Sequence, residues 1–130
     1  MPRKILRSVG HAYSGLKYAF RTERNIRLFV STYTLLVLLA FLFQFGTSEW
    51  LAFLLSGSLF LSTELLNTGL ERIVDVVDDH CKQAHQSHCF TALKHTKDIA
   101  ASASLISLAV VIVMVLILFV PHIKMLANTL

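Results

Sequence analysis

Apolar residues along this chain gather into three long blocks, which cover residues 28–45, 50–70 and 99–120. The first and third blocks contain no charged residue, and a short polar turn at 46–49 separates the first two. Each block comes close to or exceeds the length of about 20 residues that a helix needs to cross a bilayer. The pattern therefore predicts three transmembrane helices at these positions.

Residues 1–25 have a different pattern, because apolar residues recur there at helical spacing among basic ones. The apolar positions are Ile5, Leu6, Val9, Tyr13, Leu16 and Phe20. Such a segment is typical of an amphipathic helix that lies in the membrane interface. A cleaved signal peptide is not expected, because the long apolar run begins late and no small-residue cleavage site follows it.

Composition agrees with these helices. The chain has 130 residues, of which 55% are hydrophobic and 15% are charged, whereas a soluble domain has about 25% charged residues. Disorder and a water-soluble core are thereby excluded. We expect a single domain over residues 1–130 that is an all-α integral membrane protein, with one N-terminal interfacial helix and three transmembrane helices.

The basic residues indicate an orientation in the membrane. Eleven of the twelve lie in the N-terminal segment or in the polar stretch 72–98, and the 46–49 turn has none. Since Lys and Arg favour the cytoplasmic side, we expect the N-terminus and a loop at 76–96 to be cytoplasmic. We attribute the net charge of +4 to basic residues that set this orientation, so a nucleic-acid partner is not expected.

Acidic residues on the second apolar block mark a candidate site. Glu64 lies inside the block, where a charged residue costs about 2.5–3.5 kcal/mol near the bilayer centre. Asn67, Glu71, Asp75 and Asp78 follow at spacings that place them on the same helix face. With Trp50 at one boundary, Glu64 lies roughly 9 Å inside the other. Glu64 could act as a base toward a lipid hydroxyl, and Glu71 could hold a hard cation such as Mg²⁺.

Two further segments could complete this site. Glu23 lies near the end of the amphipathic segment. Lys97 and Asp98 precede a run of small residues at 100–104, which would allow close approach of another helix.

Cysteine and histidine residues in the expected loop suggest a second possibility. They are His80, Cys81, His85, His88 and Cys89. These residue types bind zinc, but their spacing matches no familiar zinc motif, so a polar loop is favoured. A disulfide between the cysteines is not expected in a reducing compartment.

Three segments together resemble the prokaryotic diacylglycerol kinase family. The run from Glu64 through Asn67 and Glu71 to Asp75 is similar to that family's E-x-x-N-x-x-x-E-x-x-x-D signature. The segment KDIAASA at 97–103 and the segment GLKYAF at 15–20, followed by Glu23, are also similar. The resemblance extends over residues 4–120, although the stretch from Asp75 to Lys97 is longer than expected for the family.

This resemblance implies a small helical homotrimer whose active sites are shared between protomers, and which transfers the γ-phosphoryl group of MgATP to a membrane lipid alcohol. It assigns the base to Glu64 and metal binding to Glu23 and Glu71. The other residues that it implicates are nucleotide contacts (Lys4, His11, Lys97, Asp98) and supporting polar positions (Asn67, Asp75). Nucleotide binding would not use a P-loop, because the Gly10 to Gly15 spacing is not followed by Lys-Ser or Lys-Thr.

The acceptor and two other functions remain open at this point. Diacylglycerol, giving phosphatidic acid, is the first expectation, and undecaprenol is the alternative, since both present one hydroxyl at the interface. A small proton-coupled transporter would also use an intramembrane Glu, but it would not need acids clustered at one membrane face. A non-enzymatic anchor subunit would leave the spacing of Glu64, Asn67 and Glu71 unexplained.

Overall fold

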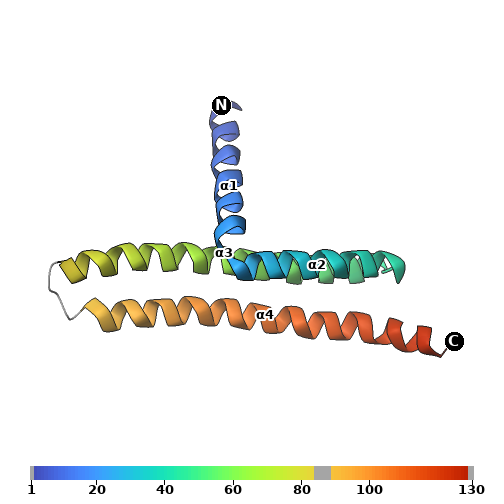
Figure 1. Cartoon of the computed structure of the whole chain (residues 1–130). Helices are drawn as coiled ribbons and strands as arrows, with labels where there is room; N and C mark the ends of the chain where they lie inside the picture. The colour runs from blue at the N-terminus through green and yellow to red at the C-terminus, as the bar shows by residue number, and fades with distance from the viewer. Residues whose placement is uncertain (1, 84–88, 129–130) are drawn as a thin grey trace.

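A computed structural model describes residues 2–83 and 89–128, and within these ranges it is helical with no strand (Figure 1). The helices are α1 (Pro2–Thr22), α2 (Arg24–Leu42), α3 (Thr47–Gln83) and α4 (Cys89–Ala127). The predicted all-α class is confirmed.

The last three helices form a bundle from which α1 projects sideways. α3 and α4 lie side by side and antiparallel, and α2 lies against the half of α3 that begins at Thr47 (Figure 1). α2, α3 and α4 are each long and apolar enough to cross a membrane, which agrees with the three predicted spans. The crosswise position of α1 is the one that an interfacial helix needs when the other three cross the bilayer.

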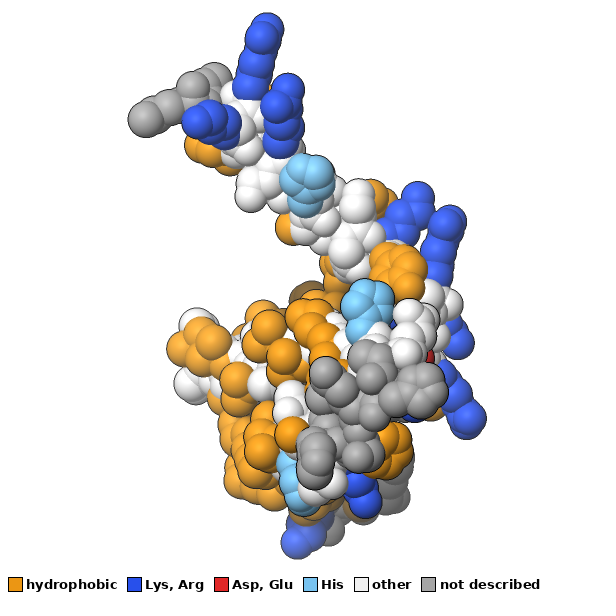
Figure 2. Space-filling model, turned by 90° about the vertical axis from the view of Figure 1, so that its left-hand side faces the viewer, with side chains coloured by type: hydrophobic (Ala, Val, Ile, Leu, Met, Phe, Trp, Pro, Cys, Tyr) orange, Lys and Arg blue, Asp and Glu red, His pale blue; other side chains and the backbone are white. Residues whose placement is uncertain are grey.

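The surface reflects the same division. Large apolar side chains are exposed on all four helices, as expected where lipid and not water is the solvent. Lys and Arg side chains gather over α1, whereas hydrophobic side chains dominate the bundle below it (Figure 2). Of the α1 side chains that the structure describes, Ala19 alone is buried, so most of the amphipathic helix is left for contact with its surroundings.

The prediction of a loop at 76–96 is wrong for the residues that the structure describes. α3 continues to Gln83 and α4 begins at Cys89, so residues 76–83 and 89–96 are helical. Within this extension the Lys82 ammonium lies 2.6 Å from the Asp78 carboxylate one turn earlier. The polar composition of this stretch led to the prediction of a loop, but such residues also form exposed helix, where ion pairs one turn apart add modest stability.

α4 also extends beyond the apolar block at 99–120, because it continues through Pro121 to Ala127. Proline has no N–H to donate to the Ile117 carbonyl one turn back, but membrane helices tolerate this loss when other groups compensate. His122 Nδ1 donates to the Leu118 carbonyl at 2.9 Å, which adds a polar contact in the turn that proline disturbs.

An aromatic core holds the bundle together at the end where α2 turns into α3. Phe53 is fully buried, and Phe45 and Phe119 are nearly so. The ring centroids of Phe45 and Phe119 lie 4.9 Å apart, and those of Tyr33 and Phe53 lie 4.5 Å apart. These rings join all three spanning helices at one end.

α2 and α3 approach closely at Gly57. The Tyr33 hydroxyl donates to the Phe53 carbonyl at 2.6 Å, which places the ring directly over the α3 backbone. A Cβ atom at Gly57 would overlap the Tyr33 ring. This contact therefore requires glycine.

The turn after α2 has a left-handed residue that is not glycine. Gln44 has a φ of 55°. Its N–H bonds to the Phe41 carbonyl, and the Phe45 N–H bonds to the Ala40 carbonyl. This is the Schellman pattern of helix termination, which usually places glycine at the left-handed position.

Candidate active site

Glu64 is buried at the contact between α3 and α4. It is 7% exposed, and the Ser104 hydroxyl of α4 donates to its Oε2 atom. A carboxylate can only accept hydrogen bonds, so a buried one needs a donor of this kind. The helical period of α3 turns Glu64 toward α4 and away from lipid.

A groove of about 530 Å³ passes beside this carboxylate. It lies between α2 and α4, with α3 along its base, and its lining combines apolar side chains with a few polar ones. The lining residues from α2 are Asn25, Leu28, Phe29 and Thr32; those from α3 are Phe60, Glu64, Asn67 and Glu71; those from α4 are Ala101, Ser104, Leu105 and Leu108.

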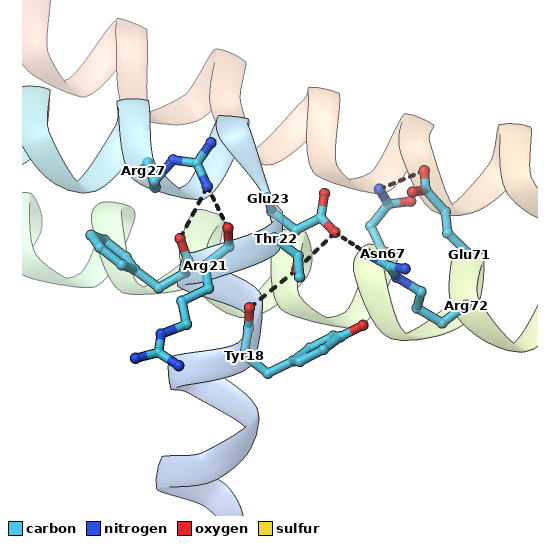
Figure 3. Close-up of polar contacts among 9 residues, drawn as sticks. Tyr18, Arg21, Thr22, Glu23, Arg27, Asn67, Glu71 and Arg72 are labelled. Carbon is cyan, nitrogen blue, oxygen red and sulfur yellow. Dashed lines mark hydrogen bonds and ion pairs between the residues drawn. The ribbon is translucent and has the colours of Figure 1, made fainter.

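Asn67 and Glu71 continue the acidic stripe along the groove, each one turn further from the bilayer centre. Asn67 Nδ2 donates to Glu71 Oε1 at 3.2 Å (Figure 3). The Asn67 Oδ1 atom is buried and has no hydrogen-bond partner among the described residues. The groove therefore contains an acceptor that a ligand hydroxyl or a water could satisfy.

Glu23 reaches the same region from the break between α1 and α2. Its backbone is extended (φ −95°, ψ 118°), which ends α1 and turns the chain. Arg72 Nη2 lies 2.9 Å from Glu23 Oε1, and the guanidinium carbon lies 5.6 Å from the centre of the Tyr18 ring (Figure 3). Arg72, next to Glu71 in sequence, thus links α3 to the α1–α2 junction.

The junction is further fixed by Arg27. Its Nη1 atom donates to the Arg21 carbonyl at 2.7 Å, and it also contacts the Phe20 carbonyl at 3.4 Å. These carbonyls belong to the last turn of α1 and have no partner within that helix. Arg27 therefore caps α1 and holds it at its angle to α2.

Asp75 and Lys97 join α3 to α4 beyond the apolar part of both helices. Lys97 Nζ lies 2.7 Å from Asp75 Oδ1. The hydrogen bond from Lys97 lowers the pKa of Asp75, and the same bond raises the pKa of Lys97. Both side chains are substantially exposed, so the pair stabilises the hairpin only modestly.

The structure brings some of the predicted site residues together and leaves others apart. Glu64, Asn67 and Glu71 share the groove, whereas Glu23 is held at its edge through Arg72. Asp98 is exposed on α4, and Lys4 and His11 are exposed on α1. Since 14 residues of helix separate Lys4 from Tyr18, Lys4 lies about 21 Å along the α1 axis from the nearest contact with α3.

The possible zinc site receives no support from the described residues. His80 and Cys81 lie on the last turns of α3. His85 and His88 lie outside the described residues, as does the side chain of Cys89. Across the part of the chain that the structure describes, no three His, Cys, Asp or Glu residues are close enough to hold a metal ion.

Sequence reasoning missed Ser104 and Arg72. Ser104 follows Lys97 by seven residues and so lies on the same face of α4, a signal that could have placed it opposite the acidic stripe. Arg72 looked like one of several topology-setting charges. No pattern within α3 alone shows that it faces Glu23, because that contact depends on the angle of α1.

Comparison with known proteins now decides the family. Residues 10–119 match the family described as prokaryotic diacylglycerol kinase. The chain belongs to this family.

Two curated members show how far the similarity extends. An undecaprenol kinase from Bacillus subtilis (strain 168) is 32% identical over 119 residues, which are 91% of this chain and 89% of that protein. A diacylglycerol kinase from Synechocystis sp. (strain ATCC 27184 / PCC 6803 / Kazusa) is 36% identical over 110 residues, or 84% of this chain and 59% of that longer protein. No solved structure matches significantly.

Membership of the prokaryotic diacylglycerol kinase family makes the protein an ATP-dependent lipid kinase. The transporter and the non-enzymatic anchor considered above are therefore set aside. The run from Glu64 to Asp75, which carries the resemblance, lies within the matched residues, and three of its members, Glu64, Asn67 and Glu71, line the groove.

Proposed function

We propose that the groove binds the hydroxyl end of a membrane lipid alcohol, and that Glu64 acts as the base when the γ-phosphoryl group of ATP is transferred to it. The observation that supports this most directly is the position of Glu64. It is buried within the apolar part of α3, yet it lines a groove that continues to Glu71 and the polar end of the bundle. A lipid hydroxyl and a water-soluble nucleotide could meet along such a path.

The proposed step is a direct displacement. The acceptor hydroxyl gives its proton to Glu64 while its oxygen forms a bond to the γ-phosphorus. The bond between that phosphorus and the oxygen bridging it to the β-phosphate breaks, and ADP leaves. Positioning supplies much of the catalysis in phosphoryl transfer, so the burial and hydrogen bonding of Glu64 suit the role.

Carboxylates at Glu71 and Glu23 are the proposed ligands of Mg²⁺. Their oxygens are the hard donors that this ion prefers, and Mg²⁺ is usually held by one or two carboxylates together with substrate phosphates and waters. Glu71 Oε1 accepts from Asn67, and Glu23 Oε1 accepts from Arg72 and Thr22. Bound Mg²⁺ would neutralise charge on the transferred phosphoryl group, and Asn67 and Arg72 hold the two carboxylates toward the nucleotide.

Nucleotide contacts are proposed for Lys97 and Asp98 at the polar end of α4, with Asp75 holding the Lys97 ammonium near the groove. Lys4 and His11 are proposed as further contacts. Because both lie on α1, which projects away from the other three helices (Figure 1), we propose that they serve the site of a neighbouring protomer in a homotrimer.

For the acceptor, we favour undecaprenol over the diacylglycerol first expected from the sequence. The relative named undecaprenol kinase aligns with this chain over nearly the whole of both proteins, whereas the relative named diacylglycerol kinase is much longer. The apolar lining around Glu64 suits either lipid, so the two are separated by assay and not by the groove.

The proposed location is a bacterial cytoplasmic membrane, with the N-terminus and the α3–α4 hairpin on the cytoplasmic side, where ATP is available. The distribution of basic residues supports this orientation.

A purified-enzyme assay tests the proposal. The protein in lipid nanodiscs would be supplied with γ-labelled ATP, Mg²⁺, and either undecaprenol or diacylglycerol. We expect labelled undecaprenyl phosphate, with turnover abolished in Glu64→Gln. Asp79→Asn is the matched control, because Asp79 is an exposed carboxylate on the same helix.

The outcomes separate the parts of the proposal. Preference for diacylglycerol would correct the acceptor alone. Full activity in Glu64→Gln would remove this residue as the base.

A further inference from the structure

We propose that Ser104 is the positioning residue of the catalytic carboxylate, fixing one oxygen of Glu64 so that the other faces the acceptor hydroxyl. This inference rests on the proposed role of Glu64. The Ser104 hydroxyl donates to Glu64 Oε2 across the α3–α4 contact. Both residues also line the groove, so the contact lies at the proposed reaction site.

The burial of both partners gives this contact its importance. Ser104 is 5% exposed and Glu64 is 7% exposed, so water has little access to replace a lost donor. A carboxylate also rotates about its last side-chain bond with little preference. One hydrogen bond from a rigid helix therefore selects between orientations that would otherwise be similar in energy.

The turn of α4 that carries Ser104 is joined to α3 by a second polar contact. Ser107 Oγ donates to the Ser104 carbonyl at 2.8 Å, and Ser107 Oγ lies 2.5 Å from Thr63 Oγ1 on α3. Thr63 precedes Glu64 in sequence, so the same two turns of α3 and α4 are joined twice. This pair of contacts fixes the register of the helices at the carboxylate.

The chemistry of serine fits the role. A hydroxyl has one hydrogen to donate, and donation to Oε2 leaves Oε1 as the oxygen able to take a proton from the acceptor. Alanine at 104 would leave the carboxylate buried without this donor and free to rotate. Supporting hydrogen bonds of this kind typically change activity 10- to 100-fold when removed.

The decisive comparison is Ser104→Thr against Ser104→Val. These side chains have nearly the same shape, but only threonine carries a hydroxyl. We expect kcat to fall about 10- to 100-fold in Ser104→Val and to be largely retained in Ser104→Thr, with the KM for ATP within about twofold of wild type in both. Ser104→Ala should resemble Ser104→Val.

Ser102→Ala is the matched control. Ser102 is exposed on the same helix and donates to the Asp98 carbonyl of its own backbone, so its loss should leave kcat unchanged. Thermal unfolding of each variant in nanodiscs measures the structural contribution separately from turnover.

Two outcomes would overturn the inference. Equal activity in the Thr and Val variants would show that shape and not the hydroxyl matters at position 104. Wild-type kcat in Ser104→Ala would show that Glu64 needs no such partner. If the wild type phosphorylates lipid, Glu64→Gln is inactive and the Ser104 variants are unaffected, this inference fails while the proposed function stands.

Discussion

At the scale of single residues, the candidate site is a group of carboxylates, each of which accepts a hydrogen bond from another side chain. Glu64 receives a hydrogen bond from α4, Glu71 receives one from Asn67, and Glu23 receives one from Arg72. Each carboxylate is thus oriented by a partner other than the metal or substrate that it is proposed to meet. Replacing a carboxylate should therefore affect turnover more strongly than replacing its hydrogen-bond partner, as expected for Glu64→Gln compared with Ser104→Val.

The proposed metal role of Glu71 gives the first prediction. Glu71→Gln should raise the Mg²⁺ concentration needed for half-maximal activity at least tenfold, because a neutral amide is a weaker ligand than a carboxylate. The measurement is a Mg²⁺ titration at saturating ATP, with Asp79→Asn as the exposed-carboxylate control. An unchanged Mg²⁺ requirement would remove Glu71 from the metal site.

Gly57 gives the second prediction. Gly57→Ala should lower the free energy of unfolding by about 1–3 kcal/mol, because the new methyl group would overlap the Tyr33 ring. Gly69→Ala is the control, since nothing lies within 4 Å of its added Cβ. Alanine there should be neutral or stabilising by up to about 1 kcal/mol.

Unfolding monitored by circular dichroism in mild detergent compares the two glycine variants. Equal stabilities would contradict the close approach of Tyr33 to α3.

The sequence predicts which residues lie together when all of them belong to one helix. Glu64, Asn67 and Glu71 share a face because of the helical period, and the structure places all three in the groove. Ser104 and Arg72 were missed because their roles depend on contacts between helices 40 or more residues apart. Periodicity does not specify which residues meet across such a contact.

At the scale of elements, apolar block length identified the three spanning helices but not their ends. The polar end of α3 and the start of α4 are helical beyond the apolar region, where Lys97 and Asp75 join the two helices. The ends of an apolar sequence block show where the residues suited to lipid stop, not where the helix stops. Helix boundaries depend on capping and on tertiary contacts.

The end of α2 gives the third prediction. Gln44→Gly should raise the free energy of unfolding by about 0.5–1 kcal/mol, because the left-handed conformation at this position costs less for glycine than for a residue with a Cβ atom. Gln44→Ala is the control and should give no such gain. Thermal unfolding of the two variants in the same detergent makes the comparison, and a less stable Gln44→Gly would contradict this description of the turn.

At the scale of the whole molecule, α1 projects away from the other three helices (Figure 1), and Lys4 and His11 are exposed on it. α1 contacts the bundle where Arg72 of α3 meets Tyr18 and Glu23. If Lys4 contacts nucleotide, it does so at a neighbouring protomer. The oligomer would then be part of the active site and not only a means of stability.

Mixing two inactive variants gives the fourth prediction. Lys4→Glu and Glu64→Gln should each lower activity strongly when alone. Coassembled in equal amounts, they should recover activity, because about a quarter of sites would combine an intact Lys4 from one chain with an intact Glu64 from another. The measurement is lipid phosphorylation by the coexpressed, doubly tagged protein. No recovery would place both residues in the same chain's site.

The uneven distribution of packing along the bundle has a mechanical consequence. Aromatic rings bind all three spanning helices together near the α2–α3 turn, whereas the groove separates α2 from α4 toward the other end. The proposed acceptor would enter at this less tightly packed end, between α2 and α4. A long hydrocarbon tail could then slide in sideways from the surrounding bilayer, so that substrate loading depends on lateral pressure and chain fluidity.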